Sequence, residues 1–232
     1  MMPQRDHLAR YHAAQLQTPA WASDRQKRLK TRVFDTFDQF LQLHARRGLE
    51  PGMALVDLGG GSGVFVECCR NMGLEAQAFD ISDGIDLERD RLPLEDGSVD
   101  VVTAISVIEH LHSPANMLNE EIRVLKPHGT LILVCPNWHY SMKDFFDDPT
   151  HVHPYTPRSL KQIIGMYGFA SATVVPWLVK KPAWLWHLPN SFFVARRLIP
   201  FRGDAPSWIP GFLKGRTASI LALGIKPDKV QS

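Results

Sequence analysis

The chain has 232 residues, of which 44% are hydrophobic and 22% charged, and its formal net charge is +2. That length supports one sizeable core with additions, and the small net charge gives no reason to expect nucleic-acid binding. Its three cysteines lack the paired spacing of zinc or redox motifs, and no segment has signal-peptide or membrane-span character. We therefore expect a cytoplasmic protein.

The first predicted element is a helix from Ser23 to about Arg47. Apolar side chains recur there at helical spacing, beginning with Leu29, and Gly48 follows where the helix would stop. Residues 1–50 are accordingly assigned as an N-terminal helical cap.

Strands and helices then alternate. The runs "ALVDL", "LEAQAFD", "SVDVVTAI" and "GTLILVCPN" are predicted strands, and the last two have the near-continuous apolar pattern of strands buried on both faces. The polar residues 83–97 allow at most a very short strand. This alternation is typical of an α/β fold with a doubly wound, mainly parallel sheet. Because ligands of such folds bind beyond the carboxyl ends of the strands, we look for chemistry after Asp57, Asp80, Ile105 and Cys135.

The last part of the chain departs from this pattern. A long loop from Pro136 to Pro157 follows the fourth strand, and loops of that length in compact domains are often functional. A helix from Arg158 to Tyr167 and the strand "FASATVVPW" come next. Residues 176–216 are assigned as a Trp- and Arg-rich insertion, and residues 217–232 as the final strand and tail.

The insertion mixes aromatic and cationic side chains. Such a mixture suits peripheral association with a membrane, here its inner face, with rings at the headgroup level. It equally suits a lid over an apolar substrate, or a small helical subdomain with its own core. All three interpretations are open at this point.

The glycine-rich segment "VDLGGGSG" indicates a nucleotide-type site. Gly59, Gly61 and Gly63 let the backbone approach a ligand, and the following helix presents free N–H groups at its start. A dinucleotide fingerprint requires Gly or Ala where Val64 stands, which disfavours a nicotinamide-dependent oxidoreductase.

Two acids refine this interpretation. Asp57, at the end of the first strand, would repel a pyrophosphate but suits a cationic ligand. Asp80, about twenty residues after the glycines, is placed to bind ribose hydroxyls. An adenosine that carries a positive centre and an amino-acid tail meets these conditions.

Here the sequence resembles the class I S-adenosylmethionine-dependent methyltransferases. The matching segments are "VDLGGGSG", "AFDIS", "IDL…LPLEDGSVDVV", "VIEHL", "EIRVLKPHGTLILVCPN" and "MYGF", in that order, within about residues 51–175. The resemblance implies a Rossmann-like, S-adenosylmethionine-binding core that releases S-adenosylhomocysteine. By the same resemblance the cofactor contacts are Asp57, Gly59, Gly61 and Gly63 for the methionine part, Asp80 and Ile81 at the ribose, Asp86 and Leu87 at the adenine, and Ile105 near the sulfonium.

Titratable side chains are concentrated at the predicted carboxyl edge of the sheet. Glu109 and His110 follow the third long strand, and "DDPTHVHPYTP" carries His151 and His153 in the loop after the next one. Both segments leave the same edge, so their side chains can approach one another. A hydroxyl acceptor must lose its proton, and a histidine with an ordinary pKa of about 6.5 is suited to take it. His110 and His153 are the candidate bases, with Glu109 as an orienting partner.

A divalent metal that orients the hydroxyl is a second interpretation. The "EH" pair with a downstream histidine resembles the metal-binding pattern of small-RNA 3′-end 2′-O-methyltransferases, and also ubiquinone-pathway O-methyltransferases. Ser106 stands where the first pattern has a further glutamate, so a metal is possible but not favoured and no metal ligand is assigned. A purely structural role for these side chains is the third interpretation.

Taken together, these features predict an O-methyltransferase that works by in-line displacement. The expected acceptor is a small molecule or a glycan or lipid-linked sugar, since "DDPTHVHPYTPRSL" with its aromatic tail is similar to methyltransferases of bacterial surface-glycan pathways. The alternative is a catalytically inactive relative that binds the cofactor, or a partner, as a regulatory module. The sequence does not predict the oligomeric state.

Overall fold

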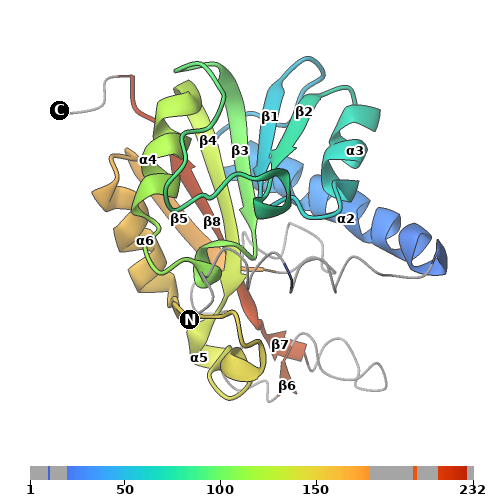
Figure 1. Ribbon diagram of the computed structural model, residues 1–232, viewed down its shortest axis with the longest axis vertical. Helices are drawn as coiled ribbons and strands as arrows, with labels where there is room; N and C mark the ends of the chain where they lie inside the picture. The colour runs from blue at the N-terminus through green and yellow to red at the C-terminus, as the bar shows by residue number, and fades with distance from the viewer. Residues whose placement is uncertain (1–9, 11–19, 178–200, 203–213, 229–232) are drawn as a thin grey trace.

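The computed structural model describes residues 10, 20–177, 201–202 and 214–228 (Figure 1). The predicted insertion of residues 176–216 lies almost entirely outside these ranges, and so does most of the chain before residue 20. The three interpretations of the insertion, as a lid, a membrane-surface segment or a small core, therefore stay predictions.

Six strands form one mixed sheet in the order β2-β1-β3-β4-β8-β5. The neighbours from β2 to β4 pair in parallel, and β8 pairs antiparallel with both β4 and β5. The strand order reverses at β1, and this switch point opens the crevice in which doubly wound sheets bind ligands. The strands are β1 (Ala54–Leu58), β2 (Glu75–Phe79), β3 (Val99–Ile105), β4 (Leu125–Pro136), β5 (Ser171–Pro176) and β8 (Ser219–Ile225).

Helices cover both faces of the sheet, α2 and α3 on one side and α4 and α6 on the other (Figure 1). Their sequences specify where they begin: Thr156 and Ser159 form a reciprocal capping box at the start of α6, and proline occupies its first position. The strand order and the helices on both faces confirm the Rossmann-like class I fold expected from the sequence. The helices are α2 (Ala20–His44), α3 (Val64–Asn71), α4 (Ala115–Val124) and α6 (Pro157–Met166). Two short 3-10 turns are η1 (Ile81–Asp83) and η2 (Ile108–His110). A separate two-stranded sheet consists of β6 (Phe201–Arg202) and β7 (Lys214–Arg216).

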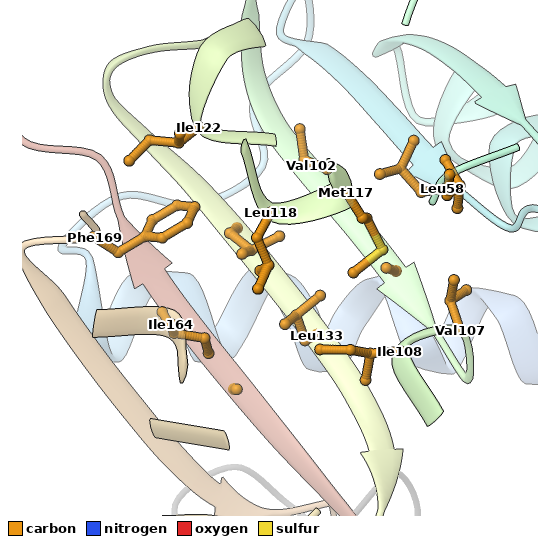
Figure 2. Close-up of a cluster of buried hydrophobic side chains, with 14 of the residues drawn as sticks. Leu58, Val102, Val107, Ile108, Met117, Leu118, Ile122, Leu133, Ile164 and Phe169 are labelled. Carbon is orange, nitrogen blue, oxygen red and sulfur yellow. The ribbon is translucent and has the colours of Figure 1, made fainter. Parts of the chain in front are cut away.

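The core consists of two apolar layers, one on each face of the sheet. Alternate side chains of a strand point to opposite faces, and in β1 Leu55 joins the layer under α2 and α3, while Val56 and Leu58 join the layer under α4 and α6. Figure 2 shows the second layer, where Met117 and Leu118 of α4 lie over the middle of the sheet.

Two local features differ from the sequence-based expectation. Leu29 is 45% exposed, because the first turns of α2 project beyond the sheet (Figure 1). The loop after β4 is not irregular throughout: it contains α5 (Trp138–Ser141) and the 3-10 turn η3 (Phe145–Asp147). The Asn137 side chain caps α5 by accepting a hydrogen bond from the His139 N–H, which gives this turn a local cause.

Candidate active site

The glycine turn, residues 59–63, joins β1 to α3. Gly59, Gly61 and Gly63 have φ angles of 67°, 52° and 69°, a backbone region that glycine adopts at little cost. A Cβ at Gly61 or Gly63 would meet no atom of the described residues within 4 Å, whereas a Cβ at Gly59 would overlap the side chain of Val107. A Cβ at Gly60 would likewise overlap Ala78, so within the described residues the turn is tightly packed at Gly59 and Gly60 and open at Gly61 and Gly63.

Asp57 lies in β1 just before the glycine turn and is 3% exposed. Its Oδ1 accepts a hydrogen bond of 2.6 Å from the Thr103 hydroxyl. Burial raises the pKa of Asp57 to about 6, although that hydrogen bond and the charge of Lys30 oppose the rise. A buried carboxyl in this state gains stability from a cationic group that binds beside it.

Asp80 follows β2 and joins two turns of the backbone. Its Oδ2 accepts a hydrogen bond of 3.1 Å from the Gly61 N–H, and its Oδ1 accepts one of 2.9 Å from the Ser82 N–H. Ile81, which follows Asp80 directly and is the first residue of η1, is half-buried. Each carboxylate oxygen can accept a further hydrogen bond, so Asp80 holds the glycine turn in place and is still able to bind a hydroxyl. Sequence reasoning missed this tethering role.

Asp86 and Leu87 have local structural partners. The Asp86 carboxylate accepts the Glu88 N–H at 3.0 Å, and the Asp86 N–H donates to Asp90 at 2.8 Å. The Leu87 side chain is buried in the layer under α4, and its carbonyl accepts a hydrogen bond from Asn116. The predicted contact of these two residues with an adenine ring stays a prediction.

The end of β3 carries a backbone feature that the sequence did not reveal. After Ile105, Ser106 has a φ of 58°, which is uncommon for a residue with a side chain. Its N–H donates to the Val134 carbonyl at 2.8 Å. This bend directs Val107 onto Gly59 and lets η2 begin at Ile108, beyond the end of β3 (Figure 2). Outliers of this kind cluster at functional sites.

The rim cluster, defined as Glu109, His110 and His151, lies beyond this bend. One potential ligand atom from each residue lies within 4.8 Å of the other two, and the two imidazole rings are 4.8 Å apart between centroids. The loop after β4 is fixed here because the N–H groups of Val152 and His153 donate to the Glu109 carbonyl at 2.9 and 3.0 Å. The proximity expected from the sequence is present, while the chemical roles stay predictions.

Glu109 is completely buried, and neither of its carboxylate oxygens has a hydrogen-bond partner among the described residues. Burial raises its pKa to about 8 and the anion of Asp148 adds to the rise, while the polar backbone and the Ser106 side chain nearby oppose it. The orienting role predicted for Glu109 is thus not carried by a hydrogen bond in this structure.

His153 is directed differently from the rim cluster. Its ring stacks on that of Tyr155, with centroids 4.7 Å apart and planes inclined by 12°. The ring is half-buried, and its nitrogens have no hydrogen bond within the described part of the chain. The two candidate bases therefore differ in their hydrogen bonding, since the His110 Nδ1 lies 2.8 Å from the Thr150 hydroxyl.

A known family has this combination of fold and turn. The family model described as "Methyltransferase domain" matches residues 21–174, from α2 into β5. The chain belongs to the class I S-adenosylmethionine-dependent methyltransferases. S-adenosylmethionine is the cofactor of this family, and the open glycine cradle next to a buried carboxyl fits a ligand with a cationic amino-acid part.

Two named methyltransferases show similarity over part of their length. Norajmaline N-methyltransferase of Rauvolfia serpentina is 28% identical over 127 residues, 51% of this chain and 40% of that protein. A ubiquinone biosynthesis O-methyltransferase of Burkholderia thailandensis is 26% identical over 98 residues, 34% of this chain and 42% of that protein. The match spans less than half the length of either relative, and their names differ in the atom that is methylated.

A solved structure shows the same fold. A chain of the complex between the Haloferax volcanii Trm112 methyltransferase activator and its methyltransferase superposes with a TM-score of 0.53. The sequences are 18% identical, and the superposition covers 92% of this chain and 97% of the other. In the present chain, no helix among the described residues is both long enough and apolar enough to cross a membrane.

Proposed function

We propose that this protein transfers the methyl group of S-adenosylmethionine to a hydroxyl oxygen of a small molecule, a glycan or a lipid-linked sugar. One observation carries the proposal: an open glycine turn and a cluster of acid and imidazole side chains occupy the same edge of the sheet, joined by the contact of Val107 with Gly59. The first suits the cofactor, and the second suits a polar acceptor that has to lose a proton.

The glycine turn and the acids beside it would bind the cofactor. In this proposal the ammonium group of the methionine part lies near Asp57, whose burial leaves its negative charge without full compensation. Asp80, with Ile81 beside it, binds the ribose hydroxyls while it keeps its hydrogen bond to Gly61. The adenine lies along Asp86 and Leu87, and Ile105 forms the floor below the sulfonium.

His153 is assigned as the group that takes the acceptor proton. The acceptor oxygen forms a bond to the methyl carbon as the carbon–sulfur bond breaks, S-adenosylhomocysteine leaves as a neutral thioether, and the hydroxyl proton goes to an imidazole nitrogen. Support comes from the geometry, because the His153 ring is half-buried and has no hydrogen-bond partner within the described chain. His110 suits the role less well, because its Nδ1 already contacts Thr150.

The proposal is tested with the purified full chain and His153→Ala. Calorimetry with S-adenosylhomocysteine measures cofactor binding, and transfer of labelled methyl groups is followed with phenols, sugars and amines as acceptors. We expect wild-type transfer to a hydroxyl compound, and a loss of about 100-fold in turnover in His153→Ala with cofactor affinity unchanged within about twofold.

His128→Asn is the matched control. His128 is exposed, pairs with Asp228 and lies near the start of β4, between the parallel pairs at Leu125 and Thr130 and at the opposite edge of the sheet, so its replacement should leave turnover unchanged. Folded protein that does not bind S-adenosylhomocysteine would overturn the proposal. Transfer to amines alone would overturn the assignment to oxygen, and turnover with any acceptor excludes an inactive regulatory module.

A further inference from the structure

We propose that Glu109, His110 and His151 bind one divalent transition-metal ion on the acceptor side of the cofactor site. The proposal rests on the proposed function in one respect, because it places the acceptor oxygen between the ion and the cofactor. The ligand atoms of the three residues lie within 4.8 Å of one another. Ligands about 2.1 Å from one ion are about 3.4 Å apart, so small side-chain rotations complete the site.

Both histidines are held in the tautomer that a metal ligand requires. The His151 Nδ1 lies 2.6 Å from the Phe145 carbonyl, and the His110 Nδ1 lies 3.2 Å from the Thr150 carbonyl. A carbonyl can only accept a hydrogen bond, so each Nδ1 carries the proton. The Thr150 hydroxyl, 2.8 Å from the His110 Nδ1, agrees with this assignment because it donates its own proton to Asp148.

The lone pair of each histidine is consequently on Nε2. Metal-bound histidines use this arrangement, in which the second ring nitrogen donates to a carbonyl and thereby fixes the tautomer and the ring orientation. The carbonyls of Phe145 and Thr150 would serve as this outer support. They belong to the loop after β4, so the order of that loop and the readiness of the site depend on each other.

The buried carboxylate of Glu109 supports a metal ion independently of the histidines. Its side chain has no exposed surface, and neither oxygen has a hydrogen-bond partner among the described residues. Buried carboxylates are normally paired or coordinate a metal. A carboxylate oxygen of Asp148 lies 4.0 Å from the His151 Nε2, so the surroundings are anionic and favour a cation.

The ligand types decide between classes of ion. Two imidazoles and one carboxylate suit Zn²⁺, Co²⁺ or Mn²⁺, whereas Mg²⁺ and Ca²⁺ prefer oxygen ligands alone. Three protein ligands leave a coordination position open, as in catalytic zinc sites. An acceptor hydroxyl in that position would be oriented and made more acidic.

Metal binding is tested on the full chain without an affinity tag, after treatment with a chelator. Co²⁺ is added while its visible absorption bands are followed, and Zn²⁺ binding is measured by calorimetry. We expect one ion per chain, no displacement by an equal concentration of Mg²⁺, and an affinity weakened more than about 100-fold in Glu109→Gln and in His151→Ala. His153→Ala is the matched control: it lies in the same loop but stacks on Tyr155, and it should retain the wild-type affinity.

Calorimetry with S-adenosylhomocysteine on the same samples separates this inference from the proposed function. Wild-type protein that binds S-adenosylhomocysteine but neither Co²⁺ nor Zn²⁺ overturns the metal site alone, and so does metal affinity that is unchanged in both ligand variants. Wild-type protein that binds the metal but not S-adenosylhomocysteine overturns the proposed function alone. If His151→Ala does not fold, Glu109→Gln decides, because it preserves the shape of the buried side chain.

Discussion

The two halves of the site are built by different means. In the proposed cofactor half, which comprises residues 57–63 and 79–87, both oxygens of Asp80 accept hydrogen bonds from backbone N–H groups, so the turn is held without a ligand. In the acceptor half, residues 105–110 and 148–155, the oxygens of Glu109 and the hydroxyl of Tyr155 have no hydrogen-bond partner in the described part of the chain. The polar groups of the first half are thus paired within the protein, whereas those of the second would be paired by the proposed metal ion and acceptor.

The contact between the two halves should be the most sensitive point. A Cβ at Gly59 would overlap Val107, and Gly59 has a positive φ besides. We expect Gly59→Ala to weaken S-adenosylhomocysteine binding more than about 100-fold and to lower the free energy of unfolding by about 2 kcal/mol. Calorimetry and chemical denaturation measure the two effects.

The double variant Gly59→Ala, Val107→Ala provides the control. Shortening Val107 removes the atoms that the new methyl group would meet, so part of the binding loss should be recovered. Gly61→Ala meets no atom of the described residues and should destabilise the protein only through its positive φ, by about 1 kcal/mol. Equal destabilisation by Gly59→Ala and Gly61→Ala would show that the contact does not join the halves.

Replacing Asp57 tests whether the cofactor half, although preformed, lacks a positive charge that its ligand would supply. Asp57→Asn removes the carboxylate, and we expect S-adenosylhomocysteine affinity to fall between about 10- and 100-fold, the loss typical of a charged hydrogen bond. The wild-type affinity should itself decrease as the pH falls below about 6, because Asp57 then becomes protonated. Calorimetry between pH 5 and pH 8 measures both changes.

Asp57→Asn should have the opposite effect on the unliganded protein, because it should increase its stability. The pKa of Asp57 in the folded protein, about 6, exceeds its ordinary value of 3.8. Between these values the folded state binds more protons than the unfolded state, so stability decreases as the pH rises, by at most roughly 3 kcal/mol. Asp57→Asn removes this penalty and should raise the melting temperature at pH 7. A lower melting temperature together with unchanged affinity would place Asp57 outside the cofactor site.

The same contrast explains what the sequence could and could not predict. Strand alternation and "VDLGGGSG" are local signals, so the sheet, the glycine turn and the position of Asp80 followed from residue order alone. The acceptor half depends on docking between segments 40 residues apart, through the Thr150 hydroxyl and the His110 ring. Neither the left-handed Ser106 nor the tautomers set by Phe145 and Thr150 leave a periodic signal in the sequence. Exposure of Leu29 likewise depends on how far α2 extends beyond the sheet.

A second buried carboxyl shows whether unpaired acids in this protein always indicate function. Glu121 of α4 has no exposed surface, and its carboxylate oxygens have no hydrogen-bond partner among the described residues. Within the described chain Glu121 does not belong to any group of three or more potential metal ligands, unlike Glu109. Glu121 is therefore expected to cost stability without contributing to binding.

Replacing Glu121 by methionine should accordingly stabilise the protein and leave cofactor and metal affinity unchanged. Burial raises the pKa of Glu121 well above its ordinary value of 4.5, so the folded wild type holds a proton that the unfolded chain loses above that value. The wild type therefore becomes less stable as the pH rises, and the advantage of Glu121→Met should grow from pH 5 to pH 8, reaching about 1–3 kcal/mol. Chemical denaturation at several pH values measures it, and Glu109→Gln in the metal-loaded protein should show no such gain. Loss of stability in Glu121→Met at every pH would mean that Glu121 has a favourable partner, and the contrast between a structural and a functional buried acid would then fail.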